Sequence, residues 1–251
     1  LRYADIIRLR GGDLFLSTKV EQIVKTSSRW VVETNNGSYS SQYIINCAGL
    51  QSDRIAKLSG ATPKAKIVPF RGEYYELKPE KRYFVKSLIY PVPNPNFPFL
   101  GVHFTKGIDG GVHAGPNAAL SFKREGYHKW DFDAKDLGEV LAYPGFWKLA
   151  LKYADIGIGE MVRSWSKAAF VRSLQRLIPE VRADDLIPCE AGVRAQALMP
   201  TGQLVDDFLL LEEQDALHVC NAPSPAATSS LEIGRAVAAR VPMPSRLQPS
   251  I

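Results

Sequence analysis

Apolar and polar side chains alternate through residues 14–37 in the pattern of short β-strands. The apolar positions within 14–16, 20–24 and 30–32 would each line one face of a strand. Asn35-Asn36-Gly37 follows the last of these runs, and its residue types favour a tight hairpin turn. The pattern therefore predicts a small antiparallel meander.

The next run, residues 43–48, is almost continuously apolar, which is typical of a strand buried on both faces. It ends at Gly49, and a short helix is predicted from Ser52 as its cap to Gly60. A buried strand, a glycine turn and a helix form half of a nucleotide-binding α/β unit, whose ligand lies beyond the strand's carboxyl end. Ala48-Gly49-Leu50 would then line a cofactor, although a plain strand–turn–helix connection explains the stretch equally well.

The middle of the chain predicts further strands and two helices around a proline-rich loop at residues 91–98. The strands are predicted at 67–77, 87–92, 99–106 and 110–116, and the helices at 146–153 and 160–178. The second helix carries an apolar stripe, with Arg163, Lys167, Arg172 and Arg176 away from it. A packing helix with a solvated face is the favoured interpretation, and contact with an anionic membrane surface is the alternative.

Strands return near the C-terminus, at residues 192–198, 203–211 and 217–221, before a helix from about 226 to 240. Ser224 is predicted to cap this helix, and Pro225 to occupy its first position. A helix N-terminus presents unpaired N–H groups and a positive dipole end, which suit an anion or an electron-rich ring. A well-capped packing helix is the alternative interpretation.

The order of these elements predicts an α/β (α+β) fold in which a cofactor half is built from both ends of the chain. Residues 1–65 and 189–251 would form a partial Rossmann-like cofactor domain, and residues 66–188 an inserted substrate domain with an antiparallel or mixed sheet. The chain starts at Leu1 within helical sequence, so we expect a fragment whose start lies upstream.

Composition narrows the function. The 251 residues are 45% hydrophobic and carry a net charge of +5, with scattered Lys and Arg, so no nucleic-acid partner is expected. No apolar run approaches the roughly 18–20 residues that cross a bilayer. Cys47, Cys189 and Cys220 lack CxxC spacing and predict a reduced, cytoplasmic protein, with peripheral contact on the inner membrane face left open. No cluster has metal-ligand spacing, so no metal is predicted.

Seven motifs occur in order between about Gly11 and Arg240. They are residues 45–50 (INCAGL), 69–75 (PFRGEYY), 90–93 (YPVP), 99–105 (FLGVHFT), 114–118 (AGPNA), 191–196 (AGVRAQ) and 221–228 (NAPSPAAT). Together they resemble the L-2-hydroxyglutarate-oxidising branch of the FAD-dependent oxidoreductases of the D-amino-acid oxidase and glycine oxidase type. That family begins with a strand–GxGxxG–helix unit and a nearby histidine segment, and neither appears here. The resemblance thus predicts a chain that lacks the N-terminal third of the family pattern.

The resemblance implies FAD as cofactor and oxidation of L-2-hydroxyglutarate to 2-oxoglutarate by hydride transfer to the flavin. Arg194, after the Ala-Gly pair, matches the arginine that holds the substrate carboxylate in related oxidases, and a guanidinium fork suits a carboxylate. An ordinary ion pair is the alternative role for Arg194. Arg71 is the second candidate, either for the distal carboxylate or, slightly favoured, for bracing the domain junction.

His103, in the family's His-Phe-Thr segment, is the preferred general base, although a histidine of the absent N-terminal part is a rival. Tyr74 and Tyr75 point to opposite faces of one predicted strand, so at most one should face the substrate. Tyr74 is the one proposed for the catalytic site. His113 is a weaker candidate, and His128 and His218 are interpreted as a surface residue and a strand residue.

The resemblance also assigns cofactor contacts. These are Val20, Ala48, Gly49, Leu50, Gly192, Pro223, Ser224, Pro225, Ala226, Ala227 and Thr228. Backbone N–H groups from Ser224 to Thr228 would face the flavin pyrimidine edge and stabilise the charge of the reduced ring. The electron acceptor would be oxygen or a membrane quinone.

Two alternatives remain open. A flavoenzyme of the same fold could act on another 2-hydroxy acid, an amino acid or glycerol 3-phosphate. A truncated remnant without catalysis could instead bind a partner or a membrane through its 145–178 helices.

Overall fold

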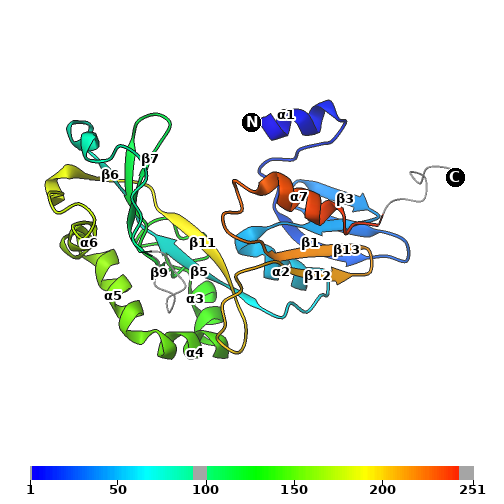
Figure 1. Cartoon of the computed structure of the whole chain (residues 1–251). Helices are drawn as coiled ribbons and strands as arrows, with labels where there is room; N and C mark the ends of the chain where they lie inside the picture. The colour runs from blue at the N-terminus through cyan, green and yellow to red at the C-terminus, as the bar shows by residue number, and fades with distance from the viewer. Residues whose placement is uncertain (1, 93–100, 243–251) are drawn as a thin grey trace.

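The computed structural model describes residues 2–92 and 101–242, which form two lobes side by side (Figure 1). The first lobe contains the N-terminal and C-terminal elements, and the second contains the middle of the chain. Four sheets of three or four strands each build the two lobes.

The first lobe opens with helix α1 (Arg2–Leu9), which buries none of its residues, and then a three-stranded meander. The strands are β1 (Val20–Lys25), β2 (Trp30–Thr34) and β3 (Gly37–Ser41). The hairpin between β2 and β3 turns at Asn35-Asn36, and Gly37 takes a φ of +108°. The predicted meander is confirmed, except that the apolar residues at 14–16 lie before its first strand.

A second sheet of the first lobe joins the two ends of the chain. Its order is β12-β13-β4, with bounds Leu209–Glu213, Ala216–Asn221 and Ile44–Asn46. Strand β13 runs parallel to β4 and antiparallel to β12. The prediction that residues 43–48 are buried on both faces is wrong: Ile45 is 45% exposed and Cys47 is exposed, because β4 is an edge strand with one face uncovered. Strand β13 is the buried one, with five of its six residues inside.

After β4 the chain forms a 3₁₀ turn, η1 (Gly49–Gln51), and helix α2 (Ser52–Leu58). Ser52 is the first helical residue rather than the predicted cap. Gly60 follows the helix with a φ of +89°, a left-handed conformation that glycine adopts without a Cβ clash.

The second lobe contains two sheets. One has the order β11-β5-β9, with bounds Gly192–Leu198, Lys66–Gly72 and Ala119–Leu120. The other has the order β10-β6-β8-β7, with bounds Leu186–Pro188, Tyr75–Leu77, Val112–Gly115 and His103–Lys106. The short η2 (Pro79–Phe84) follows β6, and η3 (Ala183–Asp185) precedes β10.

Three strand predictions need correction, two in this lobe and one in the first. The run 67–77 is interrupted at Glu73-Tyr74, where the Glu73 N–H donates to the Asn117 side chain instead of a neighbouring strand. Residues 87–92 contribute only an isolated bridge between Ile89 and Phe104. The run 203–211 becomes strand only from Leu209. Part of the proline-rich loop, residues 93–98, lies outside the described residues.

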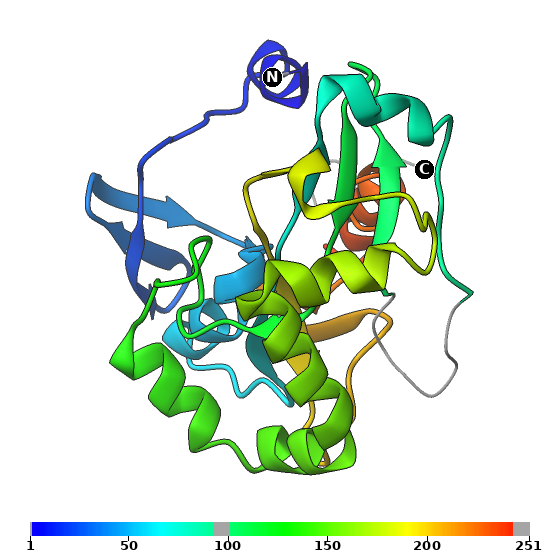
Figure 2. The same ribbon diagram turned by 90° about the vertical axis from the view of Figure 1, so that its left-hand side faces the viewer.

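Helices cover the outer side of the second lobe (Figure 2). They are α3 (Ala134–Leu141), α4 (Pro144–Lys152), α5 (Ala154–Trp165) and α6 (Lys167–Leu174). The single helix predicted over 160–178 is two helices, because Ser166 is extended and its hydroxyl accepts the Ala169 N–H as the cap of α6. Helix α3 was not predicted.

The final helix α7 (Ser230–Ala238) begins later than predicted. Residues 226–229 form turns, so Ser224 is not a helix cap and Pro225 is not at a first helical position. The segment that follows β13 is therefore an irregular turn of small, exposed residues.

Two apolar clusters hold the second lobe together. Phe104, Phe170 and Leu174 pack between the four-stranded sheet and α6. Val68 and Leu198, on paired strands, pack against Leu149 of α4. Burial of each such side chain stabilises the fold by roughly 1.5–3 kcal/mol.

Candidate functional site

A pocket of about 390 Å³, here called the reaction pocket, lies over the paired strands β5 and β11. Gly192 pairs with Gly72, and Arg194 pairs with Phe70, so these four residues share one face of the sheet. Gly192 leaves open space there, since a Cβ at this position would meet only the Tyr74 ring, at 3.9 Å. Gly72 is required by close packing, since a Cβ at this position would lie 2.5 Å from the Pro116 side chain.

Other elements contribute side chains to the same pocket. Its lining includes Tyr74 after β5, His103 at the start of β7, Asn117 before β9 and Ser224 after β13. The structure therefore brings together five residues predicted from the sequence. They are Tyr74, His103, Gly192, Arg194 and Ser224.

His103 has a defined protonation geometry. Its Nδ1 lies 3.1 Å from the Gly101 carbonyl oxygen, which can only accept, so Nδ1 carries the proton and Nε2 keeps its lone pair. The ring stacks on Tyr90 with centroids 4.3 Å apart. Burial lowers the pKa of His103, against the opposing hydrogen bond to Gly101. A neutral imidazole with a free Nε2 is the form that accepts a proton.

Tyr74 remains a neutral phenol, because burial raises its pKa and Tyr90 raises it further. It can donate a hydrogen bond at neutral pH. Arg194, by contrast, is an exposed residue of the same pocket. The pocket thus combines a guanidinium, a proton acceptor and a phenol, which together suit a small hydroxy acid.

Arg71 lies on the opposite face of the strand from Phe70 and Arg194, outside the reaction pocket. It is 5% exposed and donates to the His128 carbonyl, the Glu73 carboxylate and the Ser164 hydroxyl. This buried network supports the bracing role for Arg71.

The predicted cofactor segments are neighbours. Because β13 and β4 are parallel, with His218 paired to Asn46, both strands end at the same edge of their sheet. The Ala48–Leu50 turn follows one strand and residues 223–228 follow the other. This is where open α/β sheets bind ligands.

Hydrogen bonds fix the backbone of the first turn. Asn46, 3% exposed, accepts the Ala48 N–H at 3.0 Å and donates to the Ser52 carbonyl at 2.8 Å. Gly49 has a φ of +53° with open space around its Cβ position, so the turn leaves room for a ligand. Val20 and Ala48 line a further hollow of about 1220 Å³ beside this turn. The residues present therefore fit one side of a dinucleotide cofactor.

Sequence reasoning missed two contributors. Asn117 lines the reaction pocket and accepts the Glu73 N–H at 2.7 Å; its place in the AGPNA motif was the available signal. Arg124 donates a hydrogen bond to the Leu50 carbonyl in the Ala48–Leu50 turn, here called the cofactor turn. No local sequence pattern indicates that contact.

Comparison with known proteins agrees with this geometry. The family described as FAD dependent oxidoreductase matches residues 1–240. L-2-hydroxyglutarate dehydrogenase of Indibacter alkaliphilus is 53% identical over 237 residues, which cover 94% of this chain and 59% of that protein. The enzyme of the same name from Escherichia coli K12 is 44% identical over 239 residues, covering 95% of this chain and 57% of that protein. The chain therefore spans a little over half the length of these relatives.

Solved structures show the same fold at low identity. L-alpha-glycerophosphate oxidase of Mycoplasma pneumoniae aligns with a TM-score of 0.62 at 18% identity, over 88% of this chain and 49% of that one. Glycine oxidase of Bacillus cereus aligns with a TM-score of 0.57 at 11% identity, over 94% and 52%. The fold is that of the FAD dependent oxidoreductases. The chain belongs to the FAD dependent oxidoreductase family.

No helix in the described parts of the chain is both long and apolar enough to cross a membrane.

Proposed function

We propose that this protein, with FAD bound, oxidises L-2-hydroxyglutarate to 2-oxoglutarate. Relatives of that name at 44% to 53% identity support the substrate. The observation that carries the chemistry is the meeting of Tyr74, His103 and Arg194 in one pocket.

FAD would supply the acceptor for the hydride that leaves the substrate's C2. Val20, the Ala48–Leu50 turn, Gly192 and residues 223–228 are the groups of this chain that would hold it. The two turns at the carboxyl ends of β4 and β13 offer backbone groups rather than charged side chains.

Arg194 would bind the substrate carboxylate next to the reacting carbon. Its guanidinium can donate two parallel N–H bonds to one carboxylate, which fixes the orientation of C2 as well as its position. Gly192, on the same strand and face, leaves the space that the substrate needs.

His103 would act as the general base. Its Nε2 takes the hydroxyl proton while C2 loses hydride, so the C–O bond becomes a carbonyl and the charges balance. The Gly101 carbonyl orients the ring by accepting from Nδ1, and this bond strengthens once the ring becomes cationic. Tyr74 would donate a hydrogen bond to the bound acid.

The test is to purify the protein, measure bound flavin by its visible absorbance, and follow bleaching by a substrate panel. We expect L-2-hydroxyglutarate to reduce the flavin and yield 2-oxoglutarate, with its D enantiomer as the matched control. Preferential reduction by glycerol 3-phosphate or an amino acid would assign another substrate. A protein that never retains flavin would contradict the proposed function and favour the non-catalytic alternative.

We propose further that the reduced enzyme passes electrons to oxygen or to a membrane quinone. Helices α4 and α5 support peripheral membrane contact, because Trp147, Leu151 and Ile158 are exposed beside Lys148 and Lys152. Co-sedimentation with anionic vesicles, compared with neutral vesicles, tests this contact. Equal recovery of the protein with both would remove the electrostatic part of the proposal.

A further inference from the structure

A buried ion pair joins the two lobes next to the cofactor turn. Arg124, in the loop between β9 and α3, is 3% exposed, and Asp53, the second residue of α2, is 1% exposed. The guanidinium binds the carboxylate through both terminal nitrogens, one of them at 2.9 Å. Asp53 also accepts the Ile67 N–H at 3.1 Å, where β5 begins. The Asp53 carboxylate thus binds two parts of the second lobe, the loop that carries Arg124 and the start of β5.

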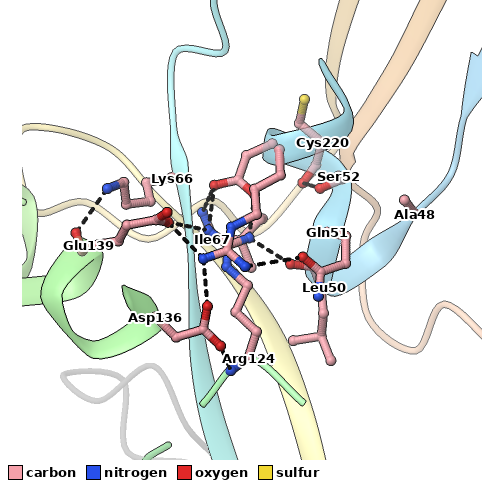
Figure 3. Close-up of polar contacts among 12 residues, drawn as sticks. Ala48, Leu50, Gln51, Ser52, Lys66, Ile67, Arg124, Asp136, Glu139 and Cys220 are labelled. Atoms are coloured by element: carbon pink, nitrogen blue, oxygen red, sulfur yellow. Dashed lines mark hydrogen bonds and ion pairs between the residues drawn. The ribbon is translucent and has the colours of Figure 1, made fainter. Parts of the chain in front are cut away.

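Arg124 also contacts the Glu139 carboxylate, at 3.4 Å, and the cofactor turn itself. Its Nη1 donates to the Leu50 carbonyl at 2.7 Å (Figure 3). Its own backbone N–H donates to the Asp136 carboxylate at 2.7 Å, which ties the Arg124 loop to helix α3. The side chain therefore reaches from a loop anchored in the second lobe to a backbone carbonyl of the first.

The turn is consequently held at both ends. Asn46 bonds Ala48 on the strand side, and Arg124 bonds Leu50 on the helix side. Asn46 is itself fixed by the fully buried His218, whose Nδ1 lies 3.1 Å from the Asn46 amide nitrogen. Gly49, between the two anchored peptides, is the residue with the left-handed backbone.

The planar shape of the guanidinium group explains why residue 124 is an arginine. A guanidinium donates in several fixed directions, so it can bind both carboxylate oxygens and a carbonyl at the same time. A lysine at this position would keep the charge opposite Asp53, but its ammonium is a compact point charge that cannot reproduce all of these directions.

We propose that Arg124 is a positioning residue for the cofactor: it sets the backbone of the Ala48–Leu50 turn, so that FAD binding depends on docking of the second lobe. This inference rests on the proposed FAD-dependent function. Arg124 touches no reacting atom; it acts through the Leu50 peptide.

A matched pair of variants tests the role. Arg54 lies beside Arg124 at the same interface, lines the same hollow as Arg124, and pairs with Asp136 at 2.6 Å and Glu139 at 3.0 Å; next to the turn it contacts a side chain, that of Gln51, and no backbone carbonyl of the turn. We compare Arg124→Lys with Arg54→Lys, measuring the FAD dissociation constant by flavin fluorescence and the melting temperature without FAD. Arg124→Lys is expected to weaken FAD binding about five- to tenfold, as for loss of one or two hydrogen bonds, and Arg54→Lys to leave it nearly unchanged.

Hydrogen exchange supplies a readout that needs no flavin. In the FAD-free protein, Arg124→Lys should speed exchange of the amides at residues 49–51 relative to Arg54→Lys. If Arg124→Lys does not fold, Arg124→Gln, which keeps N–H donors on a neutral side chain, takes its place.

The outcomes separate the two proposals. Unchanged FAD affinity and unchanged exchange in a folded Arg124 variant overturn the positioning role and leave the FAD-dependent function standing. Equal weakening of FAD binding by both variants, in step with their melting temperatures, makes Arg124 an ordinary interface residue. A wild-type protein that binds no FAD overturns the proposed function, and the positioning role with it.

Discussion

Arg194 of β11 and Arg71 of β5 lie at neighbouring positions of two paired strands, but one is exposed and the other is buried. Arg194 pairs with Phe70, and the next residue, Arg71, pairs with Val193, so the two guanidiniums leave the same pair of strands on opposite faces. Arg194 is exposed in the reaction pocket, whereas Arg71 is 5% exposed and surrounded by partners. The strand register thus decides the environment of each side chain: Arg194 faces the reaction pocket, where we propose that it binds the substrate, and Arg71 is held in a buried network.

Both terminal nitrogens of Arg71 are bound by protein groups, and Arg71 and Glu73 also line a second pocket of about 620 Å³ on their face of the sheet. The Ser164 hydroxyl donates to Glu73 at 2.7 Å, and Lys129 lies 3.7 Å from the other oxygen of that carboxylate. Arg71 and Lys129 together balance the buried Glu73 charge. Ser164 belongs to α5, so this network also attaches the helical layer to the sheet.

The largest expected effect comes from removing the brace. Arg71→Met leaves the buried Glu73 carboxylate with only Lys129 and Ser164, and loss of one partner of such a pair costs about 3–5 kcal/mol of unfolding free energy. Chemical denaturation followed by fluorescence measures this loss. Arg71→Met combined with Glu73→Gln is the control, and it should recover part of the stability.

The opposite result for Arg71→Met would contradict the structural role given to Arg71 in the comparison with Arg194. A variant with unchanged stability and a raised KM for the diacid would move Arg71 from the brace to the binding of the distal carboxylate.

The second effect falls on activity rather than stability. Arg194→Ala should lower kcat/KM for L-2-hydroxyglutarate by roughly 2–5 kcal/mol of transition-state stabilisation, with a much smaller change in unfolding free energy than Arg71→Met. Steady-state kinetics and denaturation on the same preparation measure both. Arg194→Lys, which keeps the charge without the fork, should fall between. Activity within a few-fold of wild type would remove Arg194 from the carboxylate clamp.

The contrast also shows what the sequence could predict. The meander was predictable because alternation and the Asn35-Asn36-Gly37 turn are local signals. Arg194, His103 and Tyr74 were found through motifs, and the structure places them in one pocket. The predicted burial of residues 43–48 was wrong, because a run of apolar residues does not say whether its strand lies at the edge of a sheet; Ile45 is on such an edge strand.

Non-local partners account for contacts that the sequence could not show. Arg71 contacts Ser164, and Arg124 contacts Asp53, pairs separated by 93 and 71 residues in the chain.

Two helix boundaries were misplaced for local reasons. The sequence did not show the helix break at Ser166 because an apolar stripe continues through it, although a serine cap can start a new helix at such a position. The start of α7 was misplaced because Ser224 and Pro225 fit a helix N-terminus locally, while the chain first forms a turn.

The smallest effect, and the one that sharpens the comparison most, is the pH dependence of the reaction pocket. Burial lowers the pKa of His103 from its ordinary value of 6.5, so the base stays neutral at pH 7 and gains a proton only below the ordinary histidine range. Activity should therefore be flat near neutrality and fall on acidification, with its midpoint below 6.5. The sign for stability is the same: the unfolded chain binds the proton more readily, so the His103 contribution is present above pH 6.5 and decreases as the pH falls. The pH profile of kcat/KM measures the first effect, and Arg71→Met should leave that midpoint in place because its network lies on the other face. A midpoint that stays unchanged in His103→Gln would show that another group, outside this pocket, is the base.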